Sequence, residues 1–65
     1  MSLQAGDILY YAPFNEHLLL LECEMARDGD NIDRPAWTML CLESGRETWY
    51  WEMALEDEAE YVRVA

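Results

Sequence analysis

The chain has 65 residues, of which 52% are hydrophobic and 12% aromatic, and its formal net charge at pH 7 is −10. This length fits one small domain, residues 1–65, and the apolar content argues for a folded core and against disorder. Acidic residues number 14 against 4 basic ones, all arginine, so the composition excludes a nucleic-acid surface and disfavours an anionic membrane.

Targeting and redox features are few. No stretch approaches the roughly 20 apolar residues of a membrane span. The N-terminus lacks the basic and apolar regions of a signal peptide, so a cytoplasmic protein is expected. Cys23 and Cys41 lie inside apolar runs, which predicts two reduced, buried thiols. Because a domain this small is marginally stable, we expect association with another chain to reinforce it.

Short apolar or alternating runs separated by turn residues predict an all-β fold. In chain order, the expected strands are residues 6–11, 17–26, 36–42, 46–51 and 60–64. Pro13 ends the first strand, because proline cannot donate to a β-ladder. Residues 52–59 have the composition of one short helical turn, expected to be 3₁₀. Together these elements make residues 6–64 the core of the fold.

The turn after the third strand decides which side chains face inward. A three-residue loop, residues 43–45, with Gly45 left-handed suits the sequence. It pairs residue 42 with 46, 39 with 49 and 37 with 51. The side chains then predicted on the core face are Trp37, Met39, Cys41, Trp49 and Trp51.

The second strand is aligned by folding the loop of residues 27–35 symmetrically about Asn31, which sets Leu20 opposite Leu42. The thiols of Cys23 and Cys41 are then diagonal rather than paired. An apolar patch is expected on the outer face of the sheet, and contiguous apolar surface usually marks an interface. The predicted interface consists of Leu18, Leu20, Leu40, Leu42 and Tyr50.

Three stretches carry a resemblance to a known fold family. They are Gly6-Asp7 at the first strand, "CLESGRETW" at the third-to-fourth hairpin and "EDEAEYVRV" at the end. With them, residues 5–64 resemble the small SH3-like barrel proteins, including KOW-like and Tudor-like ones, that bacteriophages and bacteria encode as short reading frames. The resemblance implies a five-stranded SH3-like barrel with one short 3₁₀ turn before the last strand, in the cytoplasm of a bacterium or phage-infected host.

The residues with which such barrels bind their ligands are only partly present in this chain. KOW-like barrels that bind RNA carry basic residues, and this chain has no lysine. Tudor-like barrels hold methylated cations in aromatic cages, for which Tyr10, Tyr11, Phe14 and Trp37 are available here. "LYYAPF" and "EAEYV" are similar to the aromatic residues with which SH3 domains bind polyproline, although the proline expected before "EYV" is absent.

The residues of catalysis and metal binding are sparse. His17 has no partner in the sequence, and neither cysteine has a basic neighbour to lower its thiol pKa, so no enzymatic activity is expected. The loop "DGDNID" departs from the EF-hand pattern, so neither a metal nor another cofactor is expected. The densest acidic run, which could form a docking surface for a basic partner, contains Glu56, Asp57, Glu58 and Glu60.

The sequence therefore predicts a non-enzymatic protein-interaction module that associates with itself, as a homo-oligomer, through the outer leucine face. One alternative is an acidic inhibitor or DNA mimic that binds a basic host protein. Another is the recognition of a methylated cation or a polyproline peptide. No nucleic acid, membrane or cofactor is expected as a partner.

Overall fold

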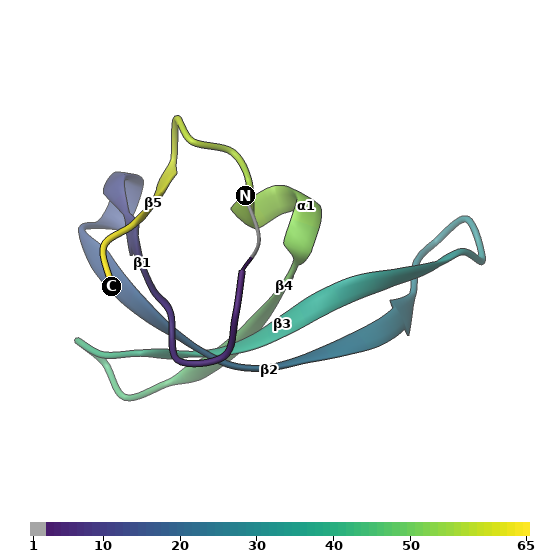
Figure 1. Ribbon diagram of the computed structural model, residues 1–65, viewed down its shortest axis with the longest axis horizontal. Coiled ribbons are helices and arrows are strands. Elements are labelled where there is room, and N and C mark those ends of the chain that lie inside the picture. Colours follow the sequence, from purple (N-terminus) through teal and green to yellow (C-terminus); the bar gives the residue numbers. More distant parts are fainter. Residues whose placement is uncertain (1–2) are drawn as a thin grey trace.

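The computed structural model describes residues 3–65 and contains five antiparallel strands in one sheet, in the order β4-β3-β2-β1-β5 (Figure 1). The strands are β1 (Ile8–Tyr11), β2 (Glu16–Arg27), β3 (Asp33–Cys41), β4 (Glu47–Trp51) and β5 (Tyr61–Arg63). A 3₁₀ turn, η1 (Ala12–Phe14), follows β1, and a four-residue helix, α1 (Glu52–Leu55), precedes β5. The all-β class is confirmed, but the helical turn before the last strand is α, and the 3₁₀ turn lies after β1.

The sheet curls around one cluster of buried side chains, with the N-terminal segment and α1 on its inner side (Figure 1). Met39 is 0% exposed and Leu20 is 1% exposed, and each such side chain contributes about 1.5–3 kcal/mol by leaving water. The cluster consists of Leu3, Leu9, Leu18, Leu20, Trp37, Met39, Cys41, Leu55 and Tyr61. Within residues 3–65, no pairing joins β4 to β5, so the sheet is not closed by hydrogen bonds.

The register between β3 and β4 differs by one residue from the prediction. Trp37 pairs with Tyr50 and Thr38 pairs with Trp49. The connecting loop is one residue longer than expected, because Cys41 donates its N–H to the carbonyl of Arg46 at 2.9 Å. Gly45 adopts a φ of 72°, as expected, and donates to the carbonyl of Cys41 at 2.8 Å.

This register corrects the predicted inner face. Trp37, Met39 and Cys41 are buried, as predicted. Trp49 and Trp51 point to the outer side, and Trp49 is 54% exposed, so their assignment to the core was wrong. The slip also turns the Tyr50 side chain to the inner side, because successive side chains in a strand alternate between the two faces of the sheet.

The register between β2 and β3 changes within the strands. Leu20 lies opposite Met39, whereas Glu22 lies opposite Thr38, so Leu21 forms a β-bulge. Because β2 has one extra residue at the bulge, the side chains before the bulge and those after it follow different alternations between the two faces of the sheet. Leu18 and Leu20 are therefore buried, at 5% and 1% exposure, and their predicted outward orientation was wrong.

Beyond the bulge, the ends of β2 and β3 form a two-stranded ribbon that projects from the rest of the molecule (Figure 1). We call residues 22–27 and 33–36 the arm. The arm accounts for the elongated shape, with principal extents of 33 × 23 × 19 Å. Its turn is closed by Asp28, whose carboxylate accepts the backbone N–H groups of Asp30 at 2.8 Å and Ile32 at 3.0 Å. The loop is thus centred on residue 30 and not on Asn31, as predicted.

Candidate binding groove

A hollow of about 260 Å³ lies at the end of the molecule opposite the arm, between η1 and the β3–β4 turn. Four aromatic side chains from four different elements line it: Tyr11, Phe14, Tyr50 and Tyr61. We call this hollow the tyrosine groove. Leu18 from β2 and Cys41 from β3 also line it and are buried. The groove is therefore an aromatic surface above a well-packed floor.

One wall of the groove is a stack of rings built by strand pairing. Tyr11 and Tyr61 lie directly opposite each other on β1 and β5, with ring centroids 4.7 Å apart and planes inclined by 22°. Phe14 packs edge-on against Tyr11 at 5.4 Å, and its side chain is 71% exposed. Offset and edge-on contacts of this kind favour a fixed arrangement of the rings.

The turn η1 holds Phe14 in that position. Pro13 occupies one of its first positions, where the lack of an N–H has little consequence. Asn15 ends the turn in the left-handed conformation, with φ of 53°, and donates its N–H to the carbonyl of Ala12 at 3.2 Å. Ala12 in turn donates to the carbonyl of Glu60 at 3.0 Å, which ties the turn to the segment preceding β5.

The other wall is Tyr50, which the β3–β4 register brings to the inner side. Its side chain is 45% exposed, although its register partner Trp37 is buried. Glu43, in the β3–β4 turn, ties that turn to the start of β2. Glu43 accepts the backbone N–H of His17 at 2.7 Å, and its Oε2 lies 2.5 Å from the Nδ1 atom of the same residue. Leu42 also donates to the carbonyl of His17 at 2.9 Å.

Charged groups surround the rings. Glu16 and Glu47 line the groove with Arg46, and the Sγ of Cys41 donates to Glu16 at 3.4 Å. Burial, with smaller effects of Tyr11, Tyr50 and nearby carboxylates, raises the pKa of Tyr61 to about 12. Burial and the Glu60 charge also raise the pKa of Tyr11. Both hydroxyls are therefore protonated, and able to donate hydrogen bonds, throughout the neutral range.

The structure separates the five residues of the predicted interface. Leu18 is part of the floor of the groove, and Leu20 lies in the core. Leu40 is half-buried on the outer face, and Leu42 is 48% exposed in the β3–β4 turn. Tyr50 is on the inner face, so no single surface carries all five side chains. The leucine face expected from the sequence does not exist in this register.

The acidic residues predicted as a docking surface lie between α1 and β5. Glu56, Asp57, Glu58 and Glu60 are all exposed there. The carboxylate of Asp57 accepts the N–H of Ala59 at 3.0 Å, and its carbonyl accepts the N–H of Tyr61 at 2.9 Å. Asp57 thus shapes the turn that delivers Tyr61 to β5.

The four aromatics proposed for a methylated-cation cage are not brought together. Tyr11 and Phe14 meet in the tyrosine groove, but Trp37 is buried and donates its Nε1–H to Glu52 at 2.8 Å. Tyr10, on the other face of β1, packs against the ring of His17 at 5.2 Å. A cage composed of this set is therefore wrong.

The two cysteines are free thiols, as expected, but only Cys41 is buried, because Cys23 lies on the exposed arm. His17, expected to be without a partner, contacts Glu43. Among residues 3–65, no group of three or more His, Cys, Asp or Glu side chains is arranged to hold a metal ion. The same residues include no helix long and apolar enough to cross a membrane.

Comparisons with protein-family models, with curated proteins and with solved structures found no match to this chain. The functional argument therefore rests on the geometry of the groove and of the arm.

Sequence reasoning missed the tyrosine groove as a unit. The sequence relates "LYYAPF", which contains Tyr11 and Phe14, and "EAEYV", which contains Tyr61, to one type of ligand. Tyr61 meets Tyr11 through the pairing of the first and last strands, and Tyr50 is added by the observed β3–β4 register. Neither contact leaves a signal in the local residue pattern.

Proposed function

We propose that this protein is a non-enzymatic protein-interaction module of the SH3-like type, and that the tyrosine groove is its binding surface. The proposed ligand is an extended, proline-containing segment of another protein with basic residues near the prolines. The observation that carries the proposal is the convergence of Tyr11, Phe14, Tyr50 and Tyr61 around one open hollow. The five-stranded antiparallel sheet, with a helical turn before its last strand, agrees with this class.

Proline suits such a surface for two physical reasons. A polyproline II segment is already extended in solution, so little conformational entropy is lost when it binds. Its flat pyrrolidine rings pack well between aromatic side chains, and aromatic-lined grooves are the usual receptors for such segments. Tyr11 and Tyr61 can also donate their hydroxyl protons to the backbone carbonyls of the ligand, which polyproline II leaves unpaired.

The acidic surroundings favour basic residues in the ligand. Glu16 and Glu47 line the groove, and the chain carries a net charge of −10. Charge complementarity of this kind increases the association rate and helps to exclude acidic partners.

A calorimetric titration tests the proposal with a ten-residue peptide of alternating proline and leucine, flanked by arginines. The control ligand replaces each proline by alanine and keeps the arginines. Binding of the first peptide and not of the second is expected. Equal binding of both would mean that only the charge is recognised, and no binding of either would refute the proposal.

The same strand supplies a matched pair of variants. Tyr50→Ala should weaken peptide binding by about tenfold or more, as for a typical aromatic residue at the centre of an interface. Trp49→Ala removes a larger ring from the adjacent position on the opposite face and should leave binding unchanged. A greater loss with Trp49→Ala would place the ligand on the outer face instead.

Self-association is a second candidate function, favoured by one observation. Trp49 and Trp51 pack edge-on at 5.1 Å on the outer face, and Trp49 is 54% exposed. We propose this tryptophan pair, in place of the leucines, as the contact between copies of the chain. Light scattering should then show a dimer that persists in added salt. The Trp49→Ala variant should be a monomer.

A further inference from the structure

The arm leaves one edge of β2 open. β1 pairs with the first part of β2, from Glu16 to Leu19, and the segment before β1 extends this pairing to Leu20, which exchanges hydrogen bonds with Gly6 and Asp7 at 2.9 Å. From residue 22 to residue 27, β2 pairs only with β3. None of residues 3–65 forms backbone hydrogen bonds with residues 22–27 on the other side. We call this side of residues 22–27 the free β2 edge.

The register shows which backbone groups this edge presents. Asp28 donates its N–H to the carbonyl of Ile32 at 2.9 Å, and this pair closes the hairpin. In an antiparallel ladder, hydrogen-bonded and non-bonded pairs alternate along the strands. The residues at positions 26, 24 and 22 therefore bond to β3. Those at positions 23, 25 and 27 direct their N–H and C=O groups to the free β2 edge.

The opposite edge of the arm, on β3, is blocked by a proline. Pro35 lies opposite Met25, at a non-bonded position, so its nitrogen is directed to the outer edge of β3. Proline offers no N–H there, which is a common means of preventing the addition of another strand. Arg34, Trp51 and Met53 also line a shallow hollow beside this part of β3.

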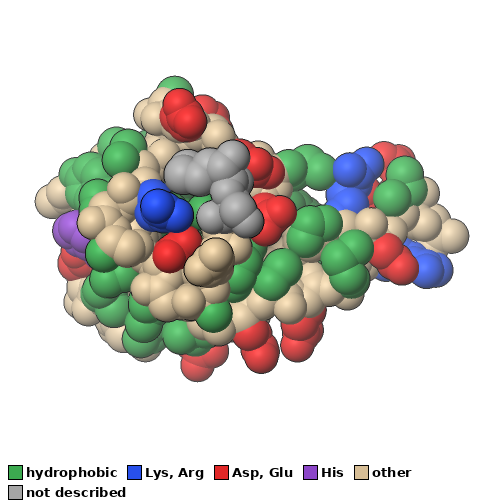
Figure 2. All heavy atoms as spheres, viewed as in Figure 1, with side chains coloured by type: hydrophobic (Ala, Val, Ile, Leu, Met, Phe, Trp, Pro, Cys, Tyr) green, Lys and Arg blue, Asp and Glu red, His purple; other side chains and the backbone are tan. Residues whose placement is uncertain are grey.

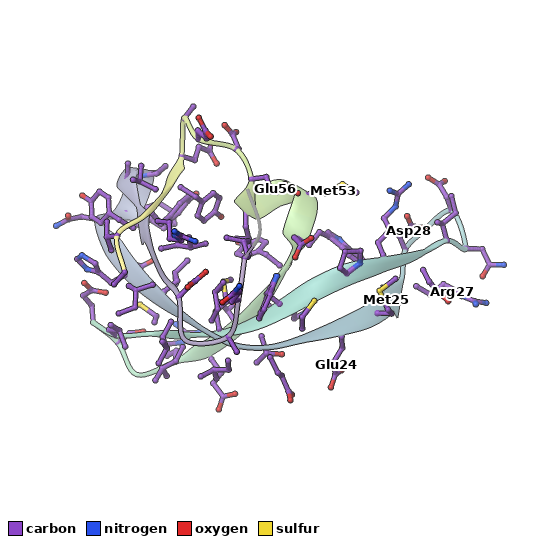
Figure 3. All side chains as sticks on the ribbon, in the orientation of Figure 1. Glu24, Met25, Arg27, Asp28, Met53 and Glu56 are labelled. Carbon is purple, nitrogen blue, oxygen red and sulfur yellow. The ribbon has the colours of Figure 1, made fainter. Side chains whose placement is uncertain are left out.

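The free β2 edge contains no proline. All five residues from Leu21 to Met25 are exposed, and Met25 is 64% exposed. Glu24 and Met25 point to opposite sides of the strand (Figure 3). Acidic side chains project from the lower border of the molecule in this orientation (Figure 2). A strand added at this edge would therefore meet open backbone groups. It would also meet an acidic row, Glu22 and Glu24, on one face and an apolar row, Cys23 and Met25, on the other.

The acidic row determines which kind of strand can bind at the free β2 edge. Glu22 and Glu24 are exposed, and neither forms an ion pair within residues 3–65. A second copy of this chain would bring glutamates against glutamates across the new ladder, and like charges directly opposite one another are destabilising. A strand with Lys or Arg at alternate positions would instead place a cation beside each carboxylate. Its intervening apolar residues would lie beside Cys23 and Met25.

We propose that the free β2 edge accepts an extended segment of a basic partner protein as an added β-strand, with Lys or Arg alternating with apolar residues. Main-chain hydrogen bonds to residues 23, 25 and 27 hold the segment, and Glu22 and Glu24 select its charge. This surface shares no residue with the tyrosine groove, so either proposal can fail without the other.

Amide hydrogen exchange of the whole chain tests this inference with two capped peptides of equal composition. One is Lys-Val-Lys-Val-Lys-Val, and the other is Lys-Lys-Lys-Val-Val-Val. The first peptide should slow exchange at the amides of Cys23 and Met25, and the second should not. Equal protection by both peptides, or protection by neither, would overturn the inference. Protection that appears without peptide and grows with protein concentration would assign the edge to a second copy and would also overturn it.

Two sets of variants sharpen the test. Cys23→Pro removes one outward N–H, which edge strands tolerate, and should weaken binding about fivefold to tenfold, the loss of one hydrogen bond. Cys23→Thr keeps this N–H and should bind as the parent protein does. If Cys23→Pro does not fold, the double variant Glu22→Lys with Glu24→Lys tests the inference in its place. It should lose the Lys-Val peptide and bind Glu-Val-Glu-Val-Glu-Val, and failure to exchange partners would contradict the role of the carboxylates.

Discussion

The carboxylate of Glu43 accepts the backbone N–H of His17 at 2.7 Å and lies 2.5 Å from the Nδ1 atom of its ring. These contacts with His17 lower the pKa of Glu43 below its ordinary value of 4.5. Because the pKa in the folded state is lowered, the ionised carboxylate stabilises the fold above pH 4.5. That contribution is lost as the pH falls through the lowered pKa.

Glu43→Gln is therefore expected to lower Tm at neutral pH and to make the acid side of the stability profile less steep. Thermal unfolding of both proteins between neutral pH and about pH 2 measures this. The difference in Tm should shrink as the pH falls below the ordinary pKa of the glutamate. A difference that is independent of pH would mean that the carboxylate charge contributes nothing.

The tryptophans provide the second test at the residue scale. Trp37 is 5% exposed and hydrogen-bonded to Glu52, whereas Trp49 is 54% exposed. Trp37→Ala should cost about 3–5 kcal/mol of unfolding free energy. Trp49→Ala should cost less than about 1 kcal/mol, as for a surface change. Urea unfolding midpoints measure both, and the reverse order of costs would restore the register predicted from the sequence.

Single residues also show how far the sequence could be interpreted. The buried state of Trp37, Met39 and Cys41 follows from an alternating apolar run, which is a local property. Leu3 and Leu55 are buried as well, at 8% and 2% exposure, but no strand pattern surrounds them. Their burial depends on where the N-terminal segment and α1 cross the sheet, which is a property of the complete fold.

At the scale of elements, the turn of the arm depends on Asp28. Its carboxylate accepts two backbone N–H groups, from Asp30 and Ile32, and pairs with Arg34. Hydrogen bonds from the Ile32 N–H and from Arg34 lower the pKa of this carboxyl, so the contacts hold at neutral pH and are lost in strong acid.

Asp28→Ala should therefore loosen the arm and leave the rest of the sheet intact. Amide hydrogen exchange is expected to become faster in residues 22–36 and to remain unchanged in β1 and β5. Residues 22–25, 27 and 33 of the arm are exposed, so the arm can open locally without unfolding of the core. A uniform increase in exchange throughout the chain would show that the arm and the core unfold as one unit.

The number and approximate bounds of the strands could be predicted, because each strand is a short apolar run between turn residues. The faces could not be predicted, for two reasons. The bulge at Leu21 inserts a residue that no turn signal marks. The β3–β4 loop is one residue longer than the sequence indicates, and its Glu43 binds a strand 26 positions earlier in the chain. Both depend on contacts between distant segments.

At the scale of the whole molecule, the charge of −10 is spread over a particle with extents of 33 × 23 × 19 Å. Ion pairs within residues 3–65 engage Arg27, Arg34 and Arg63, so most carboxylates repel one another without compensation. The Debye length falls from about 30 Å at 0.01 M salt to about 8 Å at 0.15 M. At the lower salt concentration, repulsion therefore extends across the entire protein.

Added salt is accordingly expected to raise Tm, because screening relieves this repulsion more than it weakens the few exposed ion pairs. Calorimetric scans at the two salt concentrations measure the change. A lower Tm at higher salt would show that the ion pairs of the arginines outweigh the repulsion among the carboxylates.

The turns that border the tyrosine groove, η1 and the β3–β4 turn, lie at the opposite end of the long axis from the arm (Figure 1). Two partners of different type could therefore bind at once, one through proline and aromatic contacts and the other through an added strand. Such an arrangement would make the protein a small adaptor, and the two binding reactions should be independent in a titration with both peptides.

The most direct measurement is a ¹H–¹⁵N and aromatic ¹H–¹³C NMR titration of the protein with the arginine-flanked proline–leucine peptide. If the tyrosine groove is the binding surface, the signals of Phe14 and of the tyrosines at positions 11, 50 and 61 will shift together, while the indole signals of Trp49 and Trp51 will not. Shifts at the indoles with unchanged tyrosine signals, or no shifts at millimolar peptide, would contradict the account.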